Sequence, residues 1–212
     1  QAVASSAHRN SELSIAQDML ANLTPDTSTY ITEMGAYATG EIAALANLTR
    51  PNIGLITGLS NQHLSLFGSR RKILKAKWEL INALSTQGVA VLNADDSALV
   101  NRAKNYHGRV IWYSTESKAD VYADKITVRS AALEFRLHFD SSLLNKKEQN
   151  KPLSPTVFDN LSVPLAGRGA LSNLLGALAV AQAAGADPVK LAGQSKIITP
   201  YPHTMEVLRG RS

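Results

Sequence analysis

Cysteine is absent from the 212 residues, which excludes disulfides and thiolate metal sites and fits a reducing compartment. No apolar run approaches the roughly 20 residues that a membrane-spanning helix needs. The opening residues also lack the basic-then-apolar pattern of a signal peptide. Aromatic residues make up only 6% and are not interleaved with lysines as base-stacking surfaces require. These absences predict a cytoplasmic protein without membrane insertion.

The charge is unbalanced, with a formal net charge of +5 and an isoelectric point near 9.5. Much of the excess lies in RRKILKAK, residues 70–77, and in NKKEQNK, residues 145–151. One interpretation is attraction to polyanions such as nucleic acid or nucleotide phosphates. The other is a solvated helix face and a surface loop. We favour the solvated surface, so no nucleic-acid partner is expected. Steeply salt-dependent DNA binding would be needed to support the interpretation as a polyanion-binding surface.

Helix-like and strand-like segments alternate along the first half of the chain. Apolar residues recur at helical spacing in residues 11–23, 40–48, 69–85 and 96–106. Strand-like runs cover residues 27–33, 53–57, 88–96 and 108–114. This alternation predicts an α/β fold with a mostly parallel sheet flanked by helices.

The pattern changes after residue 115. Apolar and polar residues alternate over residues 121–140, which is typical of antiparallel strands. A further strand is expected between about 155 and 164. We therefore expect a smaller antiparallel β portion around 119–164. An Ala/Leu-rich helix over 167–185 and a short helix from Asp187 follow it.

Polar side chains follow three of the predicted strands. Glu33 comes after TYIT, His63 lies just past IGLIT, and Asp95 with Asp96 follows VAVLN. Ligands of open parallel sheets bind beyond the carboxyl ends of the strands, where a carboxylate and an imidazole could hold a divalent cation. The alternative is a satisfied loop histidine and carboxylates that cap helices.

Lys77 lies on the apolar stripe of the helix predicted over 69–85. Ile73, Leu74, Leu80 and Ile81 mark the same stripe, whereas Lys75 lies off it. Lysine is almost never fully buried unless it is paired. Two interpretations stay open: a lysine at the edge of the stripe that extends to water, or a functional lysine turned toward the strand ends.

These residues belong to motifs that resemble the central domain of the Mur ligase family. The motifs are E-M-G-A-x-x-x-G-E-I, T-R-P, H-L-x-x-F-G-S, A-K-x-E-L and GVAVLNADD. They are most similar to the family member that adds D-alanyl-D-alanine to UDP-N-acetylmuramoyl-tripeptide. The resemblance implies an ATP-dependent amide-bond ligase of peptidoglycan precursor synthesis, with an acyl phosphate intermediate and with ATP and Mg²⁺ as cofactors.

The resemblance also implies roles for individual residues. The lysine matching Lys77 is carbamylated in the family, which would turn a cation on an apolar face into an oxygen ligand for a hard metal ion. The full implied set is catalytic and metal-ligating Glu33, His63 and Lys77, nucleotide-binding Arg168 and Asn173, and substrate-binding Asn10 and Ser11. Four positions depart from the family pattern, namely Ser14, Gly169, Ala170 and Thr204.

One family element is missing, since no G-x-x-G-K-[ST] phosphate loop occurs in the sequence, and Thr204 replaces an expected arginine. We therefore expect residues 1–198 to be a central domain that lacks its N-terminal phosphate-loop part. Residues 199–212 would begin the connection to a missing C-terminal domain. Two explanations compete: a fragment of an active ligase, inactive when alone, or a degenerate relative that serves as a binding or scaffolding module.

Overall fold

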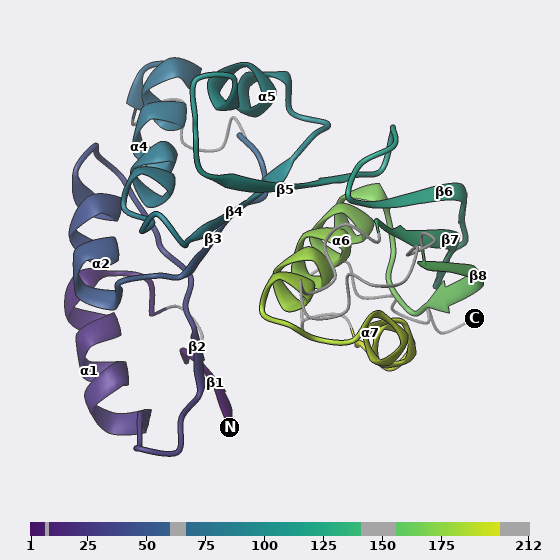
Figure 1. Cartoon of the computed structure of the whole chain (residues 1–212), viewed down its shortest axis with the longest axis horizontal. Coiled ribbons are helices and arrows are strands. Elements are labelled where there is room, and N and C mark those ends of the chain that lie inside the picture. The colour runs from purple at the N-terminus through teal and green to yellow at the C-terminus, as the bar shows by residue number, and fades with distance from the viewer. Residues whose placement is uncertain (7–8, 60–66, 141–155, 200–212) are drawn as a thin grey trace, which may run out of the picture. The chain divides into compact units, whose positions relative to one another are not determined.

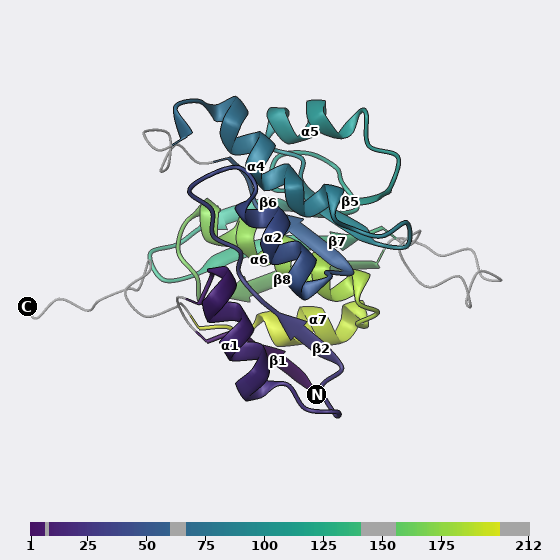
Figure 2. The same ribbon diagram turned by 90° about the vertical axis from the view of Figure 1, so that its left-hand side faces the viewer.

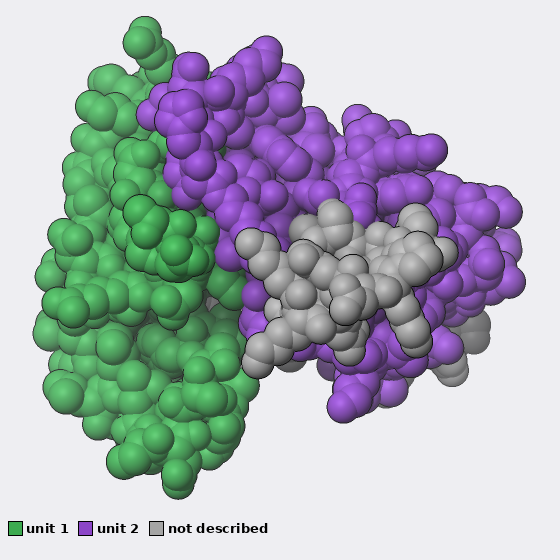
Figure 3. All heavy atoms as spheres, in the orientation of Figure 1, with its two compact units in different colours: residues 1–54, 59–88 green, residues 55–58, 89–212 purple. Residues whose placement is uncertain are grey.

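The computed structural model describes residues 1–6, 9–59, 67–140 and 156–199 (Figure 1). The chain divides into two compact units, which Figure 3 colours separately. Unit 1 contains residues 1–54 and 59–88, and unit 2 contains residues 55–58 and 89–212. Each unit is described by itself below.

The described residues of unit 1 combine three helices with a small parallel sheet. Its elements are β1 (Ala2–Ala4), α1 (Glu12–Asn22), β2 (Thr29–Ile31), α2 (Glu41–Thr49) and α4 (Arg70–Asn82). Strands β1 and β2 pair in parallel. Helix α2 packs against α1 on one side and α4 on the other, so the three helices lie side by side (Figures 1 and 2). Buried Ile15, Leu45, Ile73 and Ile81 form their shared core.

Unit 2 is built on a six-stranded sheet in the order β3-β4-β5-β6-β7-β8. Its strands are β3 (Ile53–Ile56), β4 (Val89–Asn93), β5 (Arg109–Ser114), β6 (Val121–Val128), β7 (Leu133–Phe139) and β8 (Thr156–Val163). β3 begins at the boundary between the units. The β4–β5 and β5–β6 pairs are parallel, whereas β6–β7 and β7–β8 are antiparallel. The antiparallel strands therefore continue the parallel sheet.

Within the described part of unit 2, the helices are α5 (Ser97–Ala103), α6 (Arg168–Ala183) and α7 (Pro188–Ser195). Helix α6 packs on β4, β5 and β6, and α7 packs against α6 and β8. The five residues of β4 are all buried, as expected for a parallel strand covered on both faces. Gly176 of α6 lies over the ring of Tyr113, because a methyl group there would come within 3.1 Å of the ring.

The predicted fold class is confirmed: the protein is an α/β structure with a mostly parallel sheet, antiparallel strands and flanking helices. Each helix and strand expected above has a counterpart within a few residues. Strand β1 is an addition, since three residues at the start of the chain give no periodic signal. Among the described helices, none is both long and apolar enough to cross a membrane.

Candidate functional site

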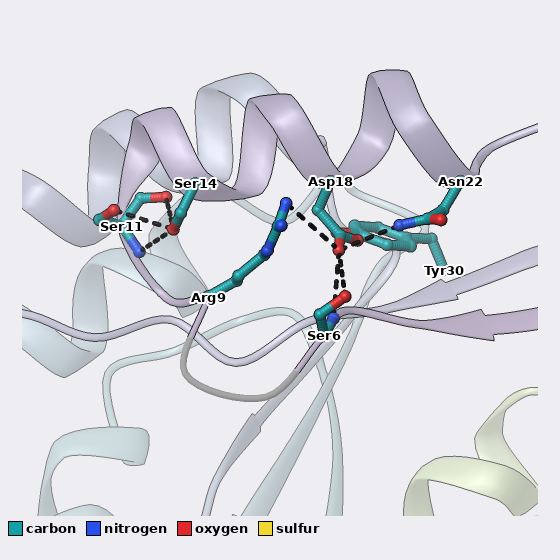
Figure 4. Close-up of polar contacts among 7 residues, drawn as sticks. All are labelled: Ser6, Arg9, Ser11, Ser14, Asp18, Asn22 and Tyr30. Atoms are coloured by element: carbon teal, nitrogen blue, oxygen red, sulfur yellow. Dashed lines mark hydrogen bonds and ion pairs between the residues drawn. The ribbon is translucent and has the colours of Figure 1, made fainter.

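Asn10 and Ser11 lie where the chain passes from β1 into α1. Ser11 is the residue before the helix, and its backbone N–H donates to Ser14 Oγ at 3.1 Å (Figure 4). Ser14 thus takes the part that glutamate or glutamine usually has in a capping box. The side chain of Asn10 packs against Gly35. The backbone carbonyl oxygen of Asn10 also accepts the Gly35 backbone N–H at 3.0 Å. The structure therefore joins residue 10 to the segment that carries Glu33.

Glu33 and Lys77 interact electrostatically within unit 1. Glu33 is exposed just beyond β2, and Lys77 is half-buried on the face of α4 that also carries Ile73 and Ile81. Burial lowers the pKa of the Lys77 ammonium, and the negative charge of Glu33 opposes that shift without cancelling it. The balance increases the share of neutral amine, the form that acts as a nucleophile.

Two carboxylates hold the far end of the segment that carries Glu33. Glu79 of α4 accepts the Gly40 N–H with both oxygens, at 2.8 and 2.9 Å, and the Ala43 N–H at 3.2 Å. Gly40 precedes α2 with a φ of 100°, a conformation that favours glycine. Glu79 thus supplies the helix cap that Gly40 itself cannot provide.

Glu41 completes this arrangement from within α2. One of its oxygens accepts the backbone N–H groups of Tyr37 and Ala38, at 2.7 and 3.2 Å. The segment between Glu33 and α2 is therefore held to α4 by Glu79 and folded back on its own helix by Glu41. Sequence reasoning gave neither residue a role, although the A-K-x-E-L motif contains Glu79 and could have drawn attention to it.

The acidic residues after β4 serve the local structure of unit 2. Asp96 precedes α5 and accepts the Ala98 N–H at 3.0 Å, so the capping interpretation is confirmed for this residue. Asp95 accepts hydrogen bonds from the Ser114 hydroxyl and from the Thr115 backbone and hydroxyl, which ties the ends of β4 and β5 together. An open pocket of about 420 Å³ lies beside Asp95.

Arg168 and Asn173 are exposed on α6, in unit 2. The residue before Asn173 is fixed by a buried network: Asn93 Nδ2 donates to Ser172 Oγ at 3.3 Å and to the Thr57 carbonyl oxygen at 2.9 Å. The Tyr113 hydroxyl donates to the same carbonyl at 3.3 Å. This network joins the end of β3 to α6, and no local sequence pattern indicates it.

The predicted site residues that the structure describes are divided between the two units. Asn10, Ser11, Glu33 and Lys77 belong to unit 1, and Arg168 and Asn173 belong to unit 2. His63 and Thr204 lie outside the described residues. Within the described ranges, no three histidine, aspartate or glutamate side chains gather as a metal-binding cluster. Glu33 is the carboxylate whose negative charge acts on the pKa of Lys77.

Comparison with known proteins gives matches along most of the chain. The Mur ligase middle domain family matches residues 2–181. A UDP-N-acetylmuramoyl-tripeptide–D-alanyl-D-alanine ligase of Escherichia coli K12 is 32% identical over 179 residues, which cover 84% of this chain and 36% of that protein. The enzyme of the same name from Synechocystis is 32% identical over 209 residues, covering 97% of this chain and 38% of its own length. The chain thus spans less than half of each relative.

Solved structures agree on the fold. The crystal structure of MurF from Acinetobacter baumannii superposes with a TM-score of 0.81 at 21% identity, covering 95% of this chain and 41% of that one. MurF ligase from Thermotoga maritima in complex with ADP gives a TM-score of 0.74 at 20% identity, covering 95% of this chain and 43% of its own.

Proposed function

Because the chain belongs to the Mur ligase middle domain family, we propose that it is the ATP-binding part of a ligase that adds D-alanyl-D-alanine to UDP-N-acetylmuramoyl-tripeptide. Two relatives with that name, each 32% identical to the chain, support this substrate pair. The reaction is proposed for a complete ligase in which this chain is the middle domain, since the chain spans 36% and 38% of those relatives. We place that ligase in the cytoplasm, where ATP is available.

The proposed reaction joins a carboxylate to an amine. The terminal phosphoryl group of ATP passes to a carboxylate oxygen of the tripeptide, which gives ADP and an acyl phosphate. The amine of D-alanyl-D-alanine then attacks the carbonyl carbon, loses a proton and expels inorganic phosphate. A new amide bond remains.

The observation that carries the proposal is the half-buried Lys77 on the apolar face of α4, on which the negative charge of Glu33 acts. The lowered pKa of Lys77 favours the neutral amine, which can add to carbon dioxide and lose a proton to form an anionic carbamate. The carbamate, Glu33 and His63 would hold Mg²⁺, and the carbamate and Glu33 would supply the hard oxygen ligands that suit it. When bound, Mg²⁺ offsets negative charge on the phosphoryl group.

Substrate and nucleotide contacts are assigned to the remaining residues. Asn10 and Ser11 would contact the muramoyl-peptide, and the packing of Asn10 on Gly35 supports this by linking the segment to Glu33. Arg168 and Asn173, exposed on α6, would contact the nucleotide. The 212 residues alone are expected to turn over no ATP, because they contain no Gly-Lys-Thr or Gly-Lys-Ser.

A second candidate is a binding or scaffolding module without catalysis. Gly169 and Ala170 favour it, since the family has histidine and asparagine at the start of this helix. The Lys77–Glu33 pair speaks against it, because a module without chemistry gains nothing from a desolvated lysine.

The test is a coupling assay with the complete protein encoded by the source gene. UDP-N-acetylmuramoyl-tripeptide, ATP, Mg²⁺ and D-alanyl-D-alanine are combined, and products are identified by mass spectrometry. The expected product carries one added dipeptide, with one ADP and one phosphate released for each. Omission of the dipeptide, or its replacement by D-alanine, is the control. Binding of nucleotide and muramoyl-peptide without any product would instead support the noncatalytic module.

A further inference from the structure

A fully buried carboxylate lies on α1 directly behind the segment that carries Asn10. Asp18 is 0% exposed, although helix α1 has solvent on its other face. Figure 4 shows that its partners come from different parts of unit 1 and converge on the two carboxylate oxygens. Aspartate is rarely buried to this extent unless its charge is paired and hydrogen-bonded.

The contacts of Asp18 connect three elements. Its Oδ1 accepts the Ser6 backbone N–H at 3.2 Å and the Ser6 hydroxyl at 2.9 Å, just past β1. Asn22 Nδ2, one turn later on α1, donates to the same oxygen at 3.1 Å. The Tyr30 hydroxyl of β2 donates to Oδ2 at 2.9 Å. Both strands of the small sheet are therefore fastened to α1 through one side chain.

The charge of Asp18 is also placed next to Arg9. Arg9 Nη1 lies 3.9 Å from Asp18 Oδ1, and the Arg9 side chain is 42% exposed. The Ser6 backbone N–H contributes most to a lowered pKa of the Asp18 carboxyl, so this group is an anion near neutral pH. Arg9 immediately precedes Asn10, and Asn10 is in turn packed on Gly35.

We propose that Asp18 is a positioning residue for muramoyl-peptide binding, acting through its contacts with Ser6 and with Arg9, the neighbour of Asn10. The inference rests on the substrate role proposed above for Asn10 and adds to it. Asp18 holds Ser6 and Arg9 so that the Asn10 amide stays against Gly35. Loss of these contacts lets that amide move, and losing one hydrogen bond to the substrate lowers the binding affinity by about twofold to tenfold.

The test uses the complete ligase with Asp18→Ala and Asp18→Asn. Alanine removes every acceptor and keeps the helix, whereas asparagine keeps one oxygen acceptor. Asp18→Ala is expected to weaken UDP-N-acetylmuramoyl-tripeptide binding, measured by titration calorimetry and as KM, by roughly twofold to tenfold. The KM for ATP should stay unchanged, and Asp18→Asn should fall between wild type and Asp18→Ala.

A matched control separates positioning from general loss of stability. Asp187 accepts the Val189 and Lys190 N–H groups at 2.7 and 3.1 Å at the start of α7, in unit 2. Asp187→Ala therefore also removes a carboxylate that accepts backbone N–H groups. It should lower the melting temperature and leave the muramoyl-peptide affinity unchanged.

A double-mutant cycle decides whether Asp18 acts through Asn10. Asn10→Ala alone should weaken muramoyl-peptide binding, and adding Asp18→Ala to it should weaken binding little further. Full additivity of the two changes, or an equal loss of ATP and muramoyl-peptide affinity in Asp18→Ala, overturns the inference. An Asn10→Ala ligase that binds normally also overturns it, by removing the Asn10 role on which it rests. Failure of the proposed function is a distinct result, because wild type would then form no product.

Discussion

Gly176 and Gly193, in helices α6 and α7 of unit 2, provide a matched test of how tightly α6 packs on the sheet. A methyl group at Gly176 would lie 3.1 Å from Tyr113 Cζ and 3.3 Å from both Cε1 and Oη. A methyl group at Gly193 of α7 would meet nothing within 4 Å. Gly176 lies in the middle of α6 and Gly193 in the last turn of α7, so replacement by alanine gives each a gain in helix propensity.

The expected magnitudes differ because only one site is crowded. Gly193→Ala should raise the free energy of unfolding by up to about 1 kcal/mol, the propensity difference between glycine and alanine in a helix. Gly176→Ala gains the same amount but overpacks against Tyr113, which is fully buried and hydrogen-bonded to Thr57. Overpacking costs roughly 1–3 kcal/mol, so the net change should be between about zero and a loss of 2 kcal/mol.

Urea unfolding of the two variants checks this difference. Both positions lie in unit 2, so both report on the same part of the chain. Thermal unfolding should separate the two melting temperatures by several degrees, at roughly 2–4 °C for each kcal/mol in a chain of this size. Equal stabilisation by both substitutions would refute the packing argument, because it would mean that α6 accommodates a methyl group over Tyr113 without strain.

Three further predictions concern unit 1. Gly35→Ala places a methyl group 2.9 Å from Asn10 Nδ2 and should raise the KM of the complete ligase for the muramoyl-peptide, with the KM for ATP unchanged. Glu79→Ala removes the cap of α2 and should cost about 1 kcal/mol in urea unfolding, whereas full retention of stability would contradict the capping role. The pKa of Asp18 is lowered in the folded state, so its stabilisation is present above its ordinary pKa and is lost as pH falls through the folded value. Acid titration should therefore unfold wild type with a steeper pH dependence than Asp18→Asn.

The long helices and buried strands could be predicted because each carries its own periodic signal. Helix α4 and strand β4 are examples, since the stripe through Ile73 and Ile81 and the apolar run of residues 89–92 are local patterns. The position of Lys77 on the buried side of α4 followed from the same spacing.

Interactions between distant residues could not be predicted in this way. Glu79 caps helix α2 by accepting the N–H groups of Gly40 and Ala43, which lie 39 and 36 positions earlier in the chain. Asn93 reaches Ser172, 79 positions later. Such contacts depend on how elements pack, which no local pattern encodes. Asp18 is an intermediate case, because its place three residues after buried Ile15 puts it on the inner face of α1. A polar residue at that spacing was a signal that could have been used.

The central claim is that this chain carries the catalytic lysine of an amide ligase, and Lys77→Ala in the complete enzyme tests it most directly. Lys75 lies on the exposed side of the same helix, so Lys75→Ala is the control. We predict that Lys77→Ala lowers kcat at least about a hundredfold, as expected for loss of a group that stabilises transferring charge. Acetate or another short carboxylate should restore part of that activity by replacing the carbamate oxygens, with no such effect on Lys75→Ala. Equal activity of the two variants, without any response to acetate, would contradict the account.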